Sequence, residues 1–171
     1  FLEHMAFNGS KHFDKNELIN YVEGIGVKFG PHLNAYTSFD ETVYMLQVPT
    51  DKPEILEKGL LILEDWANGL TLSTEEINKE RGVVISEWRS SLGPQQRMQY
   101  KFFPVLFQGS RYPERFPIGD TAVIKKASPD VVKRFYKDWY RPDLMAVVLV
   151  GDFDLDQMEK EIIEKFSVIP A

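Results

Sequence analysis

The chain opens on an ionisable pair in apolar surroundings, Glu3 and His4 within FLEHMAFNGS. A residue four positions before His4 would share its face of a helix, and that position lies one residue before Phe1. If it held histidine, the stretch would read H-F-L-E-H, the inverted helical zinc motif. Two imidazoles one turn apart can hold zinc, and the glutamate beside the second can reach the water on the metal. The alternative is a helix end with a solvated Glu-His pair.

A catalytic zinc site takes a third protein ligand, and INKERGVVISEW supplies two candidate carboxylates, Glu80 and Glu87. Their spacing is close to two helical turns, so both project from one face of one helix. Apolar residues 83–85 lie between them, so part of this helix is buried and its carboxylates need partners. A metal ion and a histidine that needs orienting would satisfy both. The alternative is that one or both face water and pair with Lys79, Arg81 or Arg89.

Composition narrows the class of protein further. The 171 residues suit one domain, and a hydrophobic content of 43% is enough for a core. The net charge of −6, with scattered basic residues, argues against a nucleic-acid surface. Cysteine is absent, so any metal must use His, Asp or Glu, and His12 and His32 have the character of turn or surface residues. The apolar run at 144–150 is too short to span a bilayer.

Helices and strands are interspersed along the chain, which predicts an α+β fold with helices packed against a mainly antiparallel sheet. The first residues read as a helix end stopped by Asn8 and Gly9. Period, capping residues and turn residues predict further helices at about 14–25, 53–68, 73–92, 128–139 and 155–166. The same signals predict a hairpin at 32–48 and a fully buried strand at 144–151, with a less regular stretch at 94–117.

Four blocks of the sequence, in order, resemble a known family: FLEHMAFNGS, LNAYTSFDETVYMLQVP, INKERGVVISEW and RFYKDWYRPDLMAVVLVGDFD. They resemble the N-terminal domain of the M16 metallopeptidases, the family of pitrilysin, insulin-degrading enzyme and mitochondrial processing peptidase, in its bacterial zinc protease form. The resemblance covers nearly the whole chain. It implies that residues 1–171 form one N-terminal, catalytic-type M16 domain.

The resemblance also implies roles for individual residues. Glu3 matches the general base, and His4 matches the second zinc ligand. The family has a Glu-x₆-Glu pair downstream, in which Glu87 matches the third zinc ligand and Glu80 the carboxylate that supports the site. Because the spacing from the motif admits either carboxylate, the choice of Glu87 rests on motif order.

In the family, the strand matching LNAYT is an edge strand beside the zinc, where an extended peptide adds as a further strand. Asn34, Ala35 and Tyr36 are therefore the candidate substrate-binding residues, the alternative being an ordinary hairpin. The implied function is a zinc metalloendopeptidase that cleaves extended peptides with a zinc-activated water. The implied cofactor is one Zn²⁺ per complete site. The implied partners are a peptide and the C-terminal M16 half, in the same or a partner chain.

The first zinc-ligating histidine and the family's opening strands would precede Phe1. The polypeptide as given is therefore expected to be a fragment that lacks competent catalysis. Some family members are non-catalytic partners that keep the fold as a scaffold or peptide-binding half. The retention of Glu3, His4, Glu80 and Glu87 argues against that class. The sequence leaves the compartment open, with a bacterial cell envelope or periplasm favoured.

Overall fold

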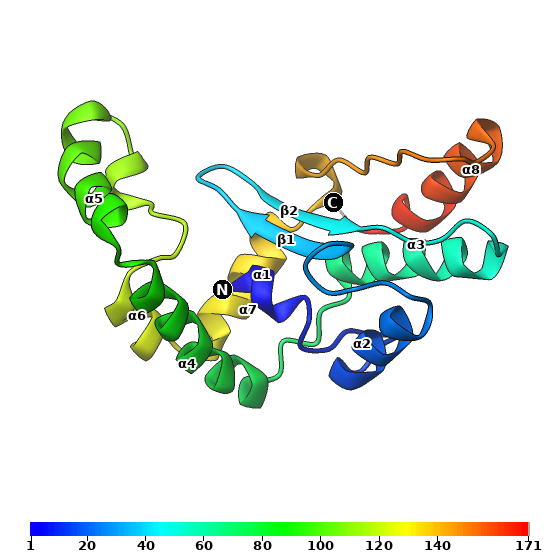
Figure 1. Cartoon of the computed structure of the whole chain (residues 1–171), viewed down its shortest axis with the longest axis horizontal. Helices are drawn as coiled ribbons and strands as arrows, with labels where there is room; N and C mark the ends of the chain where they lie inside the picture. The colour runs from blue at the N-terminus through cyan, green and yellow to red at the C-terminus, as the bar shows by residue number, and fades with distance from the viewer. Residues whose placement is uncertain (171) are drawn as a thin grey trace.

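An antiparallel pair of strands lies at the centre of the computed structural model, which describes residues 1–170 (Figure 1). Strand β1 (Leu33–Thr37) pairs with β2 (Thr42–Leu46), with Leu33 opposite Leu46 and Thr37 opposite Thr42. Thr, Tyr and Val favour the pleated conformation here, and the turn falls at the FDE sequence. The predicted hairpin is thus confirmed, and the sheet of the helix-rich fold is small.

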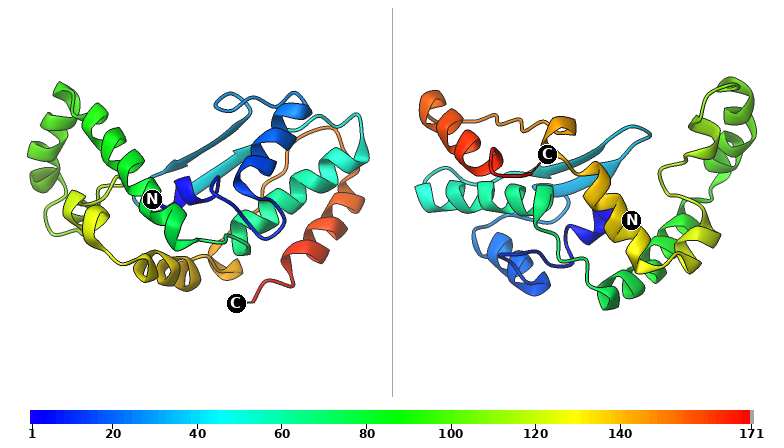
Figure 2. Two further views of the ribbon diagram at one scale, coloured as in Figure 1. Left: turned by 90° about the horizontal axis from the view of Figure 1, so that it is seen from below. Right: turned by 180° about the vertical axis from the view of Figure 1, so that it is seen from behind.

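Helices surround this hairpin. The helices that precede the sheet are α1 (Leu2–Met5) and α2 (Lys15–Gly24). Those that follow it are α3 (Pro53–Asn68), α4 (Thr74–Ser91), α5 (Pro94–Leu106), α6 (Thr121–Lys126), α7 (Pro129–Trp139) and α8 (Leu155–Phe166), with short 3₁₀ turns η1 (Tyr112–Glu114) and η2 (Pro142–Leu144). In two further views, α5 stands at one end of the molecule and α8 lies beside α3 at the other (Figure 2). Within residues 1–170, no helix has both the length and the apolar content that crossing a membrane requires.

Helix starts follow the capping residues of the sequence. The backbone N–H of Asp14 donates to the Glu17 carboxylate at 3.4 Å, as in a capping box. Pro53 occupies the first turn of α3, where its missing N–H leaves no hydrogen bond unmade. Ser73 Oγ accepts from the backbone N–H of Glu76 at the start of α4. Local chemistry therefore sets where these helices begin.

The prediction of an irregular stretch at 94–117 is wrong, because its first half forms helix α5. Pro94 lies at the first turn of that helix and is compatible with it. Pro104 lies within its last turn, so the loss of its N–H bond and the clash of its ring affect the end of the helix and not its middle. The aromatic residues that suggested irregularity instead hold the helix by packing, since Phe103 stacks on Phe116 with ring centroids 5.5 Å apart.

The prediction of a buried strand at 144–151 is also wrong for the described residues. Residues 145–150 pair with no other strand of the described part, and Val148 and Val150 are 79% and 93% exposed. Met145 has an extended backbone, and exposure alternates along the segment, as strand geometry dictates. The sequence favours an extended chain correctly, but a buried strand also needs neighbours that accept its backbone hydrogen bonds.

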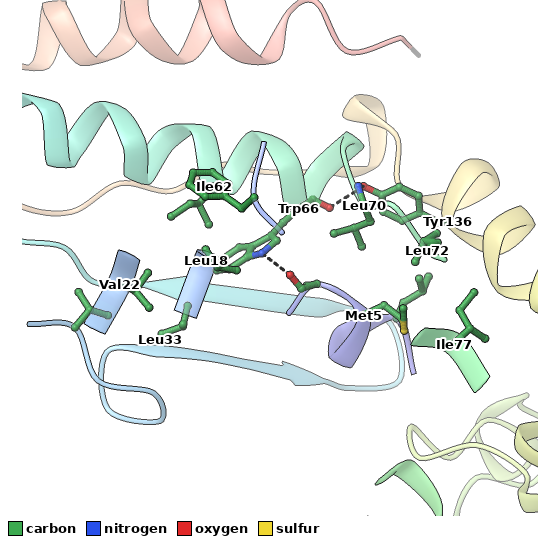
Figure 3. Packing of buried hydrophobic residues seen from close by; sticks show 14 residues of the cluster. Met5, Leu18, Val22, Leu33, Ile62, Trp66, Leu70, Leu72, Ile77 and Tyr136 are labelled. Atoms are coloured by element: carbon green, nitrogen blue, oxygen red, sulfur yellow. Dashed lines mark hydrogen bonds between the residues drawn. The ribbon is translucent and has the colours of Figure 1, made fainter. Parts of the chain in front are cut away.

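The core lies between α3, the hairpin, α2 and the segment that follows α1 (Figure 3). Trp66 is 2% exposed, and its indole Nε1 donates to the carbonyl of Ala6 at 3.0 Å. Phe7 packs edge-on against the Trp66 ring, with centroids 5.7 Å apart. The last turn of α3 thereby fixes the end of α1 by both a hydrogen bond and packing.

The turn after α1 is held by a second buried group of α3. Asp65, 2% exposed, accepts hydrogen bonds from Ser10 Oγ at 2.5 Å and from the backbone N–H of His12 at 2.9 Å. Its other oxygen lies 2.8 Å from His12 Nδ1. Gly9 has a backbone φ of +111°, a value that residues with a side chain rarely adopt. A Cβ added at Gly9 would lie 3.2 Å from Thr71 Oγ1. The turn therefore requires glycine at this position.

We predict that Trp66→Ala lowers the free energy of unfolding by about 3–5 kcal/mol, because it removes a large buried ring and a hydrogen bond. Trp139→Ala is the matched control, since Trp139 is 59% exposed, and it should change stability by less than about 0.5 kcal/mol. Urea denaturation followed by circular dichroism measures both. Equal losses in the two variants would contradict this account of the core.

Candidate active site

His4 lies between two carboxylates of α4. Its Nδ1 is 2.8 Å from Glu80 Oε1, and its Nε2 is 3.2 Å from Glu87 Oε2. The two glutamates lie two turns apart on one helical face, as the sequence predicts, and α1 packs against that face. One imidazole therefore has a carboxylate at each of its nitrogen atoms.

The two carboxylates differ in environment. Glu80 is 8% exposed, and its Oε2 accepts from Asn8 Nδ2 at 2.9 Å, whereas the side chain of Glu87 is 53% exposed. The hydrogen bond to Glu80 raises the pKa of His4 against the opposing effect of burial. The hydrogen bond from His4, with that from Asn8, lowers the pKa of Glu80 although burial opposes it. Glu80 is thus an ionised, fully bonded partner, while Glu87 is open to solvent.

The His4 and Glu87 atoms are compatible with two adjacent zinc ligands. Tetrahedral zinc with bonds of about 2.0–2.2 Å places neighbouring ligand atoms about 3.3–3.5 Å apart, close to the 3.2 Å between Nε2 and Oε2. A carboxylate on the remaining imidazole nitrogen is the usual companion of a ligating histidine, and Glu80 has that place. Within residues 1–170, no group of three or more His, Asp or Glu side chains is arranged to hold a metal. His4 and Glu87 are therefore two candidate ligands.

Glu3 points toward strand β1. Its Oε2 accepts a hydrogen bond from Thr37 Oγ1 at 2.5 Å. Behind it, the hydroxyls of Tyr44 and Tyr140 lie 2.8 Å apart, and burial raises the pKa of both. Both phenols therefore stay neutral beside Glu3, and Thr37 holds one oxygen of its carboxylate.

A hollow of about 660 Å³ lies between the predicted catalytic residues and strand β1. Glu3, His4 and Glu80 line it together with Asn34 and Ala35 of β1. Its apolar wall is formed by Phe7, Ile19 and Phe29. The structure thus brings two of the three candidate substrate-binding residues beside the predicted catalytic pair.

The third candidate, Tyr36, is directed elsewhere. Its ring is 44% exposed, and its hydroxyl donates to Glu41 Oε1 at 3.1 Å across the hairpin. Tyr36 does not line the hollow that Asn34 and Ala35 border. Its predicted role in substrate binding remains a prediction.

Two residues of the site were absent from the sequence-based set, Asn8 and Thr37. Asn8 was interpreted only as a helix stop, although a residue four positions after His4 is placed on the same side of a helical turn. Thr37 is two residues from Ala35, so strand alternation puts both on one face. Spacing could therefore have suggested their direction, but only the tertiary structure shows that they bond to Glu80 and Glu3.

Comparison with known families gives the class of protein. The sequence model of the insulinase family, peptidase family M16, matches residues 1–100. The model of the peptidase M16 inactive domain matches residues 126–171. Because the first match covers more than half of the chain, the chain belongs to peptidase family M16.

Relatives named as proteases share both sequence and structure with the chain. "Probable zinc protease PqqL" of Haemophilus influenzae is 42% identical over 166 residues, covering 97% of this chain and 18% of the relative. The crystal structure of the periplasmic protease PqqL from Escherichia coli is 36% identical, with a TM-score of 0.92, covering 99% of this chain and 19% of that one. A ferredoxin protease solved in complex with Arabidopsis ferredoxin is 29% identical, with a TM-score of 0.88. The match covers 99% of this chain and 19% of that protease. The chain thus spans about a fifth of the length of these relatives.

We predict that Glu80 and Glu87 differ sharply in their effect on stability. Glu80→Ala leaves His4 and Asn8 without their buried acceptor and should lower the free energy of unfolding by about 1–3 kcal/mol. Glu87→Ala, at an exposed side chain, should change it by less than about 0.5 kcal/mol. Urea denaturation without added metal measures both. If Glu87→Ala lowered the free energy of unfolding more than Glu80→Ala, Glu80 would not be the buried acceptor of this site.

Proposed function

We propose that this chain is the catalytic-type domain of a zinc metalloendopeptidase that hydrolyses extended peptides. The observation that carries the proposal is the position of His4 between Glu80 and Glu87. In this family, that arrangement fits a ligating histidine with one carboxylate as fellow ligand and the other as orienting partner. Relatives named zinc proteases support the choice of metal.

His4 Nε2 and Glu87 Oε2 would hold the zinc ion, and Glu80 would fix the ring of His4 through Nδ1. Asn8 in turn fixes Glu80, so the imidazole is oriented by a chain of two hydrogen bonds. Zinc bound there supplies a Lewis acid that polarises the scissile carbonyl and acidifies water. A histidine one position before Phe1 would supply the further ligand.

Glu3 would act as the general base. Thr37 holds its Oε2, which leaves Oε1 to take the proton from the attacking water and to return it to the departing amine. The neutral phenols of Tyr44 and Tyr140 add no competing charge behind it. These contacts support a carboxylate kept in one orientation for proton transfer.

The substrate would lie along β1 as an added strand. In the described part, β2 is the strand that pairs with β1, and Leu33 at the start of β1 also forms an isolated bridge with Phe29. Asn34 and Ala35, beyond that bridge, border the hollow that Glu3 and His4 line. Main-chain hydrogen bonds along such an edge bind peptides of varied sequence. Asn34, Ala35 and Tyr36 are the proposed substrate-side residues.

The remaining parts of the enzyme would come from polypeptide outside these 171 residues. Solved relatives include the periplasmic protease PqqL and its first half alone, which supports an association with a C-terminal M16 half. On this proposal, the 171 residues alone are inactive. The periplasmic relative from Escherichia coli supports a periplasmic location.

The test of the metal site uses the longer protein that contains this chain. Glu87→Gln should abolish stoichiometric zinc, measured by inductively coupled plasma mass spectrometry after dialysis. Glu80→Gln should weaken zinc affinity by about 10–100-fold, because it removes the orienting partner. Glu75→Gln is the control, since Glu75 is an exposed acid of the same helix. If Glu80→Gln abolishes zinc while Glu87→Gln retains it, the two roles are reversed.

The test of the base separates proton transfer from metal binding. Glu3→Gln should retain full zinc content yet lower kcat for a peptide by about 10²–10⁴-fold. The control is Glu17→Gln, at an exposed acid that caps α2 and lies outside the hydrogen bonds of the site. Unchanged cleavage in Glu3→Gln would exclude Glu3 as the base.

The residue encoded immediately before Phe1 decides between the two classes of family member. Histidine completes H-F-L-E-H and predicts an active peptidase. Any other residue leaves the site without a ligand and favours a non-catalytic partner subunit. Sequencing the codon immediately upstream of the codon for Phe1 in the gene identifies this residue.

A further inference from the structure

Helix α5 is apolar on two faces, and only one of them is packed. The packed face carries Phe103 and Phe107, whose rings lie 5.1 Å apart and join a cluster of aromatic side chains. Within that cluster, Phe39 of the β1–β2 turn lies 5.0 Å from Tyr112, and the Tyr112 hydroxyl donates to Asp40 at 2.7 Å. The cluster thereby attaches α5 to the end of the hairpin, since the rings of Phe39 and Phe103 lie 6.2 Å apart. In Figure 1 the β1–β2 turn points toward the end of the molecule where α5 stands.

The opposite face of α5 is exposed, with one ring contact to the cluster, that of Phe102 against Phe103 at 5.0 Å. Four of its residues share the spacing i, i+4, i+7 and i+8, which places them on one side of a helix. Their exposed fractions are 62%, 42%, 76% and 65%, for Met98, Phe102, Val105 and Leu106 respectively. Contiguous exposed apolar side chains of this kind mark interaction sites more often than ordinary surface. We call these four residues the outer face of α5.

The charge beside this face is positive, in contrast to the chain as a whole. Arg97 and Lys101 are exposed and lie one turn apart along the edge of the outer face. Residues 94–116 contain four basic side chains and one acidic one, a net charge of +3, in a chain whose net charge is −6. A partner that covers the outer face should therefore combine apolar and acidic side chains.

The packed face of α5 lies beside the turn that follows the proposed peptide-binding strand, and the outer face is on the far side of the same helix. The aromatic cluster includes Phe39, and its Tyr112 bonds to Asp40; both residues lie in the turn after β1. At about 3.3 Å per residue, the path from Ala35 to Phe39 is about 13 Å. A peptide that lies along β1 and continues past the turn would reach α5 within a few residues.

We propose that the outer face of α5 is a docking surface for an acidic and apolar segment of the substrate, outside the cleavage site. This inference rests on the proposed peptidase function, since the occupant is a substrate. Symmetrical pairing of two copies through this face is disfavoured, because Arg97 and Lys101 of both would meet. The surface would select proteins whose acidic segment lies a short distance from an extended, cleavable one.

The first experiment measures binding without catalysis, in the longer protein carrying Glu3→Gln. The probe is a fluorescein-labelled peptide of alternating Glu and Leu residues, followed by fluorescence anisotropy. Val105→Glu combined with Leu106→Glu should raise its Kd at least about tenfold, and Lys101→Glu alone should also weaken it, more so at low salt. Ile163→Glu is the matched control, because Ile163 is 57% exposed on the distant helix α8. Equal affinity in all variants, or equal binding of a Lys-Leu peptide, would overturn the proposal.

The second experiment uses the protein with Glu3 intact and two substrates, a short neutral peptide and the same peptide extended by the Glu-Leu segment. Val105→Glu with Leu106→Glu should raise KM about tenfold for the extended substrate alone, with kcat unchanged. Equal effects on both substrates would overturn the docking role. A changed oligomeric state or a lower Tm in the variant would also overturn it, by showing that a second copy or another part of the protein covers the face. If the wild-type protein cleaves neither peptide while the probe still binds, the proposed peptidase function is contradicted. Binding of an acidic, apolar segment by the outer face is then still supported.

Discussion

One buried carboxylate, that of Glu80, determines how the parts of the candidate site are arranged. Helix α1, described over Leu2–Met5, packs against α4. Its position depends on partners, and Glu80 bonds at once to the ring of His4 and to the side chain of Asn8. Because an ionised group is costly to bury, it is tolerated only with such partners. The same bonds that keep Glu80 buried therefore orient the imidazole toward Glu87.

The hairpin serves both the packing and the chemistry. Its inner face carries Leu33 into the core, while Thr37 on the same face holds Glu3. Its edge borders the hollow at Asn34 and Ala35, and its turn is anchored by the aromatic cluster on the packed face of α5. A single short sheet thus connects the base, the proposed substrate edge and the outer face of α5. Displacement of the hairpin would disturb all three together.

Local signals allowed much of this fold to be predicted. The starts of α2, α3 and α4 follow from local chemistry: Glu17 accepts from the backbone N–H of Asp14, Pro53 suits a first turn, and Ser73 accepts from a backbone N–H of α4. Prediction failed where distant residues decide the outcome. Helix α5 is held by rings that meet only after folding, and residues 145–150 are extended without a described partner strand.

The candidate site divides in the same way. Glu3, His4, Glu80 and Glu87 could be selected from their types, their spacing and the resemblance to a family. The contacts of Asn8 and Thr37 join positions 72 and 34 residues apart, and no local pattern reports such pairs. Spacing along α4 left open which glutamate binds metal, whereas burial distinguishes their environments.

The turn after α1 has a consequence for how this sequence can vary. It is held at both ends, by Glu80 through Asn8 and by Asp65 through Ser10, with Gly9 alone between them. Inserting or deleting one residue here would release one end or the other, since neither carboxylate belongs to a mobile loop. Evolutionary change in length should therefore be excluded from this tripeptide. It should be admitted instead in exposed segments such as the loop between α5 and η1.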